Sequence, residues 1–207
     1  MFIELTDHLR CPAPHEEAYL VLVPYEMDGR MVVRGVLGCP ICQREFRINR
    51  GVAVFELNGR TGDAAPALTD SIPADAIVAF LGLEGPGGYL GLFGGASGLG
   101  ASLETALPGV HLVALNPPDG WTGSPSVSLL RGPTAPIKSR SLRGVVLGGD
   151  IGSNPEWQKE AGRCVLPGLR VVGEGTPPRL PELESLGEAG GWWVARKGLR
   201  AGPLDVV

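Results

Sequence analysis

The sequence predicts an α/β protein in which a small β-rich module precedes a larger, mostly parallel sheet of the doubly wound type. From residue 71 onward, short apolar runs alternate with helix-like segments, a pattern typical of strands joined by crossover helices. Before residue 58 the apolar runs instead follow one another around turn dipeptides, without helices between them. Residues 58–70 are small, polar and aperiodic, so we interpret them as a linker between domains 1–57 and 71–207.

The sequence of the N-terminal module predicts two β-hairpins. The run "AYLVLVPYEMDGRMVVRGVLGC" places two β-rich segments around Asp28-Gly29, a dipeptide suited to the positive φ angles of a tight hairpin turn. The run "EFRINRGVAVFEL" repeats this pattern around Asn49-Arg50-Gly51.

The second part alternates helices and strands. Helices are predicted over 70–85, 98–107, 153–166 and 180–190, and strands over 89–93, 110–116, 126–132, 142–150, 168–175 and 191–198. The connections "PPDGWTGSPS" and "GPTAPIKSR" are too short and proline-rich to hold crossover helices. Because a parallel sheet needs both faces covered, we expect the N-terminal module or a second copy of the chain to close one face.

Composition limits the function classes. The chain has 207 residues, of which 43% are hydrophobic, so a packed core is expected. With 18 Lys+Arg against 22 Asp+Glu, overall charge argues against nonspecific nucleic-acid binding. One basic segment could still contact RNA phosphates or an acidic partner, or be a solvated loop; it carries Arg131, Lys138, Arg140 and Arg143. The sequence has neither a secretion signal nor a run of 18 apolar residues, so we expect a cytoplasmic protein without a membrane segment.

A metal site is predicted in the N-terminal module. Cys11-Pro-Ala-Pro-His15 and Cys39-Pro-Ile-Cys42 form two turns on either side of a hairpin, and Zn²⁺ takes four nitrogen or sulfur ligands at tetrahedral corners. His8 competes with His15 as the fourth ligand, and a reduced or redox-active C-x-x-C without metal is the other interpretation. A site with four protein ligands is closed to substrate, so a zinc ion here would be structural.

The N-terminal motifs resemble a known family. "LTDHLRCPAPH", followed by "GCPICQREFRINRGVAVFE", is similar to the zinc-ribbon activator subunits of tRNA and rRNA methyltransferases over residues 1–57. The chain departs from that family in using His15 as the second ligand and in the long loop between the two turns. The resemblance implies a zinc ribbon that stabilises a protein partner.

The glycine-rich stretch "YLGLFGGASG" and the later segments "LRGVVLGGD", "EAGRCVLPGLRVVGEG" and "LGEAGGWWVARKG" resemble, in order, the class I S-adenosylmethionine-dependent methyltransferases, which implies a reduced Rossmann-like sheet. The resemblance assigns the cofactor-binding positions to Gly91, Gly94, Gly95, Ser97 and Asn116. In that family an acid ends the first strand and another, at the end of the second, holds the ribose hydroxyls. Here Gly91 and Asn116 stand in those places, which removes two charge-assisted contacts.

Two functions follow from these motifs. The first is a zinc-binding protein whose methyltransferase-like domain has lost catalysis and acts as a binding or regulatory module, with a protein partner or self-association. The alternative is an active S-adenosylmethionine-dependent methyltransferase on RNA or a small molecule. Asp150 is a general base in the second interpretation and a turn residue in the first, and "NPPD" is interpreted as a turn, so no catalytic residue is assigned.

Overall fold

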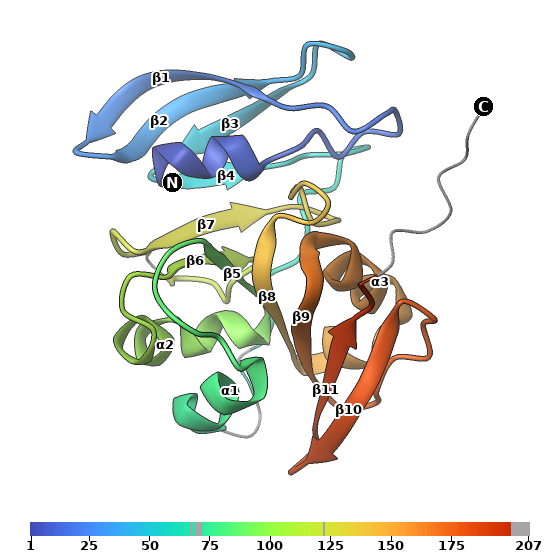
Figure 1. Ribbon diagram of the computed structural model, residues 1–207. Helices are drawn as coiled ribbons and strands as arrows, with labels where there is room; N and C mark the ends of the chain where they lie inside the picture. The colour runs from blue at the N-terminus through green and yellow to red at the C-terminus, as the bar shows by residue number, and fades with distance from the viewer. Residues whose placement is uncertain (67, 69–71, 122, 200–207) are drawn as a thin grey trace.

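Across the residues that the computed structural model describes, 1–66, 68, 72–121 and 123–199, eleven strands form one sheet in the order β1-β2-β3-β4-β7-β6-β5-β8-β9-β11-β10 (Figure 1). The fold is therefore mixed α/β, with a large sheet and short helices. None of the helices in this part of the chain is both long enough and apolar enough to cross a membrane.

The N-terminal strands are antiparallel, and the two predicted hairpins are present. They consist of β1 (Val21–Asp28), β2 (Met31–Gly38), β3 (Glu45–Asn49) and β4 (Val52–Val54). Gly29 (φ 55°) and Gly51 (φ 78°) supply the left-handed backbone of the two turns. Strand β4 then pairs in parallel with β7, with Val52 opposite Leu129, so the N-terminal strands extend the sheet of the second part.

The centre of the sheet is parallel. It contains β5 (Tyr89–Gly94), β6 (His111–Leu115), β7 (Val127–Arg131), β8 (Leu142–Gly148) and β9 (Val165–Glu174). Three of the predicted helices form: α1 (Ala74–Leu81), α2 (Gly100–Ala106) preceded by the 3₁₀ helix η2 (Gly95–Leu99), and α3 (Pro155–Cys164). Asn154 caps α3, because its side chain accepts hydrogen bonds from the amides of Glu156 and Trp157.

The helix predicted over 180–190 is wrong. This segment is strand β10 (Leu183–Ala189), which pairs antiparallel with β11 (Trp192–Lys197). The helix-like spacing of Leu180, Leu183 and Leu186 is overridden by Gly190 and Gly191, whose φ angles of 57° and 79° form a tight hairpin turn. Strand β11 also pairs with β9, so the hairpin completes that edge of the sheet.

Each face of the central sheet packs against different elements. One face carries Leu90, Leu92 and Val146 against α1 and α2. On the other face the 3₁₀ helix η1 (Ile3–His8) lies over the start of β5 and β6, since the Phe2 ring stacks on His111 at 4.6 Å and the His8 ring packs on Tyr89 at 4.4 Å.

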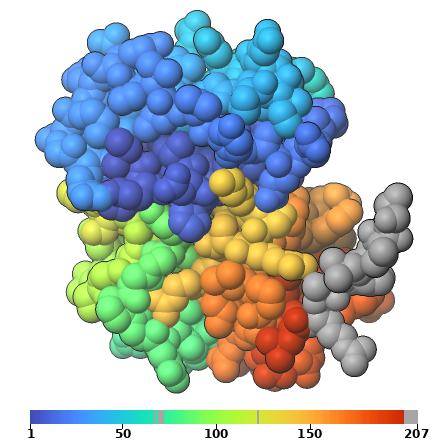
Figure 2. Space-filling view, turned by 45° about the horizontal axis from the view of Figure 1, so that its top comes forward, coloured from blue at the N-terminus to red at the C-terminus, as the bar shows by residue number. Residues whose placement is uncertain are grey.

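The N-terminal module therefore covers a face that the short connections leave without helices. Figure 2 shows the module, in blue, packed along one side of the remaining chain, with the yellow segment near residues 133–141 at the border. Backbone contacts fix this border: the amide of Arg10 donates to the Pro136 carbonyl at 3.0 Å and that of Lys138 to the His8 carbonyl at 2.8 Å.

Candidate metal centre and sheet crevice

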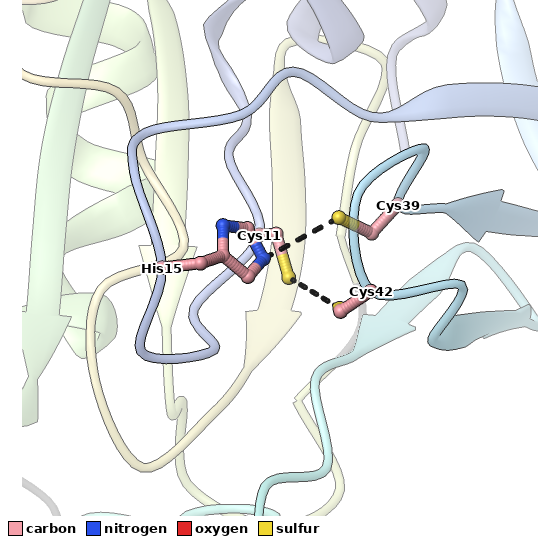
Figure 3. A group of neighbouring side chains, drawn as sticks. All are labelled: Cys11, His15, Cys39 and Cys42. Carbon is pink, nitrogen blue, oxygen red and sulfur yellow. Dashed lines mark hydrogen bonds between the residues drawn. The ribbon is translucent and has the colours of Figure 1, made fainter.

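Cys11, His15, Cys39 and Cys42 point toward one another, and their ligand atoms all lie within 4.8 Å (Figure 3). The Cys11 and Cys42 sulfurs are 3.7 Å apart, and the Cys39 sulfur is 3.5 Å from His15 Nε2. A zinc tetrahedron with bonds of about 2.3 Å to sulfur and about 2.0 Å to nitrogen has edges of about 3.8 Å and about 3.5 Å. The four side chains therefore have the chemistry and the spacing to hold a zinc ion.

The competing ligand His8 lies elsewhere, against the Tyr89 ring. In contrast, His15 has a second contact that orients its imidazole: Nδ1 lies 2.6 Å from the Glu16 carbonyl oxygen. A proton on Nδ1 donates to that oxygen, which leaves the lone pair of Nε2 directed at the three sulfurs. Of the two histidines considered, His15 therefore meets the requirements of a metal ligand.

Local backbone hydrogen bonds shape the Cys39–Cys42 turn and so position its two sulfurs. The Gln43 amide donates to the Cys39 carbonyl at 3.0 Å, and Gln43 adopts the left-handed conformation (φ 58°) that reverses the chain. Although burial opposes ionisation of Cys42, the Arg44 amide and the neighbouring ligands lower the pKa of this thiol to about 7. Burial raises the pKa of Cys11 to about 12, so metal binding must displace a proton there.

The first metal turn also connects the N-terminal module to the rest of the chain. The Glu17 carboxylate accepts hydrogen bonds from the Ser139 amide at 2.9 Å and its hydroxyl at 2.8 Å, and it lies 3.8 Å from the Arg163 guanidinium of α3. Arg163 in turn pairs with Glu160 at 2.9 Å. A metal ion that fixes residues 11–15 would therefore also fix this contact with α3.

A second candidate site lies at the carboxyl ends of the parallel strands. The chain continues from β5 to β6 on one side and later from β8 to β9 on the other, so β5 and β8 form the topological switch point where open α/β sheets bind ligands. A crevice of about 230 Å³ lies there, lined by Gly94, Asn116, Gly148, Asp150 and Trp157 together with residues between 60 and 66. This volume is below the range of about 300 to 1,000 Å³ typical of ligand pockets.

The segment that precedes α1 occupies part of this space. The Ala65 amide donates to the Asn116 carbonyl at 3.2 Å. A methyl group placed on Gly148 would lie 2.7 Å from Leu68 Cδ2, and one placed on Gly95 would lie 3.2 Å from the Pro66 carbonyl oxygen. Residues 65–66 and Leu68 therefore lie directly against the strand ends where a cofactor of a doubly wound protein would approach.

The five candidate cofactor residues divide into two groups. Gly94 (φ 61°) and Asn116 line the crevice. Gly91 lies inside β5, where an added methyl group would be 2.8 Å from the Phe93 ring, and Gly95 is buried at the start of η2. The buried Ser97 hydroxyl donates to the Leu92 carbonyl at 3.1 Å.

The side chain of Asn116 is engaged with the backbone. Its Nδ2 donates to the Gly132 carbonyl at 2.8 Å, and its Oδ1 accepts from the Gly132 amide at 2.9 Å. Asn116 is 7% exposed, so both contacts are shielded from water. An amide in this arrangement has few hydrogen-bonding positions left for ribose hydroxyls.

Asp150, the candidate general base, also lines the crevice, whereas the other lining residues belong to no recognisable sequence motif. Asp63 comes from a segment without periodicity, and Trp157 lies on a helix whose sequence signals only its cap. Only the order of strands in the sheet, which brings β5 beside β8, would have indicated them.

The basic segment contacts the protein itself. Arg131 pairs with Asp119 at 3.0 Å, and the Lys138 ammonium donates to the Asp7 carbonyl at 2.8 Å. The Arg143 guanidinium donates to four consecutive carbonyls, those of residues 84–87. Three of the four basic side chains of this segment therefore bind groups of the same chain.

Similarity to known proteins is found among solved structures. No protein-family model matches the chain, and no curated protein does. Among solved structures, a chain described as a methyltransferase of an antibiotic biosynthesis pathway from Anabaena variabilis matches with 18% identity and a TM-score of 0.37. The match covers 48% of this chain and 43% of the other, so this chain spans less than half the length of that protein and the likeness identifies no family.

Proposed function

We propose that this chain is a zinc-binding protein whose sheet serves as a binding module and no longer carries a nucleotide-type cofactor. The observation that carries the proposal is the crevice at the switch point, where the chain's own residues 65–66 and Leu68 lie against the ends of β5 and β8. A cofactor would have to displace this segment to reach the glycines.

Two further features support the loss of the cofactor. The crevice has the volume of only a small ligand, and both polar atoms of Asn116 are bonded to Gly132. In addition, Gly91 has no carboxylate and lies within the strand, away from the crevice. S-adenosylmethionine would therefore meet neither of the acids that bind it in the proteins this sequence resembles.

The binding part of the proposal is supported by the edge strand β1. Its outer residues Val21, Val23 and Tyr25 are 50%, 50% and 65% exposed. Apolar side chains gathered on one exposed strand are typical of a surface that a protein partner covers. Light scattering on the zinc-loaded protein tests self-association first: a dimer that Val23→Lys returns to monomer supports this surface as the interface.

Calorimetry with S-adenosylmethionine and S-adenosylhomocysteine on the zinc-loaded protein tests the central part of the proposal. We expect no heat of specific binding at millimolar ligand. A matched variant, Asn116→Asp, restores one carboxylate at the crevice and should also fail to bind, because the segment before α1 still fills the space. Micromolar affinity of the wild-type chain for either compound would refute the proposal and favour an active methyltransferase.

A further inference from the structure

A groove lies between the N-terminal hairpins and the β6–β7 connection. It measures about 440 Å³, within the range of small-molecule sites. Its floor is formed by Val52 of β4 and Leu129 of β7, which are paired in register, and by Met31. The connection between β6 and β7 has no helix in its described residues, so this end of the sheet face is left open.

Trp121 forms one wall of the groove. Its indole packs on the first turn of α2, since a methyl group placed on Gly100 would lie 2.6 Å from the ring. A flat aromatic side chain held in this way offers a surface for stacking or for apolar contact. The interior of the groove is therefore suited to an apolar or aromatic group.

Two side-chain charges of opposite sign line the rim of the groove, beside the N-terminal amino group of Met1, which donates to the Gly51 carbonyl at 2.8 Å. Asp28 comes from the turn between β1 and β2, and Arg50 from the turn between β3 and β4. A hydrogen bond from the Gly51 amide to the Val33 carbonyl, 2.9 Å long, holds the two hairpins together at this end. Both side chains are exposed, and within the described residues neither has an ion-pair partner within 4.0 Å, so the two charges do not neutralise each other.

We propose that this groove binds the zwitterion of an apolar α-amino acid. The ligand's ammonium group pairs with Asp28 and its carboxylate with Arg50, while its side chain packs between Trp121 and the floor of Val52 and Leu129. A ligand with only one charge would leave one rim residue unpaired, and a ligand without an apolar side chain would leave the floor in contact with water. This site is separate from the metal centre and the crevice, so it does not depend on the function proposed above.

Titration of the zinc-loaded protein with L-phenylalanine, followed through the indole N–H resonance of Trp121, tests the proposal. The resonance is assigned with Trp121→Phe. We expect a saturable shift at millimolar ligand. N-acetyl-L-phenylalanine, which lacks the ammonium, and L-phenylalaninamide, which lacks the carboxylate, should each bind at least about tenfold more weakly.

Two variants connect these preferences to the rim. In Arg50→Gln the preference for phenylalanine over its amide should disappear, and in Asp28→Asn the preference over the N-acetyl compound should disappear. Arg179→Gln, an exposed arginine outside the groove, serves as the matched control and should leave both preferences unchanged. The proposal is overturned if the Trp121 resonance does not respond, if the three compounds bind equally, or if the rim variants keep both preferences.

Discussion

Substitution of Asn116 by alanine gives the sharpest prediction about the crevice. The change removes the two hydrogen bonds to Gly132 and leaves a buried amide and a buried carbonyl without partners, at a cost of about 1 to 3 kcal/mol each. Alanine also tolerates the left-handed backbone of this position (φ 55°) less well than asparagine, by about 1 kcal/mol. We therefore expect the free energy of unfolding to fall by about 3 to 7 kcal/mol.

Urea unfolding of the zinc-loaded protein, with linear extrapolation to zero denaturant, measures this loss. Asn116→Gly is the matched control, because glycine removes the same hydrogen bonds without the backbone penalty and should be about 1 kcal/mol less destabilising than alanine. A loss below about 1 kcal/mol for Asn116→Ala would refute the reasoning, because the amide would then contribute no more than an exposed side chain.

Three further predictions concern acidity and packing. Although burial opposes its ionisation, hydrogen bonds from Ser139 lower the pKa of Glu17, so its stabilisation is present above about pH 4.5 and lost as the pH falls through the lowered value. Urea unfolding should find Glu17→Gln less stable than the wild type at neutral pH, and this difference should shrink as the pH falls below about 4.5. A difference that does not change with pH would contradict this. Burial lowers the pKa of His111 to about 4, so only the unfolded chain gains its proton as the pH falls from about 6.5. Thermal unfolding should show that the free energy of unfolding falls by at most about 3 kcal/mol between about pH 6.5 and about pH 4, and His111→Gln should abolish this fall. An unchanged fall in the variant would assign it to other groups. Gly173→Ala would place a methyl group 2.1 Å from the Trp193 ring and should cost about 1 to 3 kcal/mol in urea unfolding, and a neutral result would mean that the ring can move aside.

The parts of the structure that could be predicted from sequence are those set by local chemistry. The metal ligands follow from two short motifs in which prolines shape the turns, and His15, the predicted fourth ligand, lies with the three cysteines, whereas its competitor His8 lies against Tyr89. Helix α3 follows from Asn154, which satisfies the first amides of the helix whatever lies around it. Such features depend on neighbours a few residues away.

Features that depend on distant contacts could not be predicted in this way. The parallel pairing of β4 with β7 joins residues more than 70 positions apart, and nothing in the apolar pattern of either strand specifies it. The segment before α1 has no periodicity, so its packing against Asn116 and Gly148 leaves no signal in the sequence. The 180–190 segment was misassigned because the pairing of β10 with β11 outweighs the spacing of its leucines.

X-ray absorption at the zinc edge of the purified protein, with the zinc content measured alongside, tests the central claim most directly. A closed structural site made by Cys11, His15, Cys39 and Cys42 requires one zinc per chain, with three sulfur neighbours at about 2.3 Å and one nitrogen neighbour at about 2.0 Å. Absence of zinc, fewer than three sulfur neighbours, or a fifth ligand in the coordination shell would contradict the account.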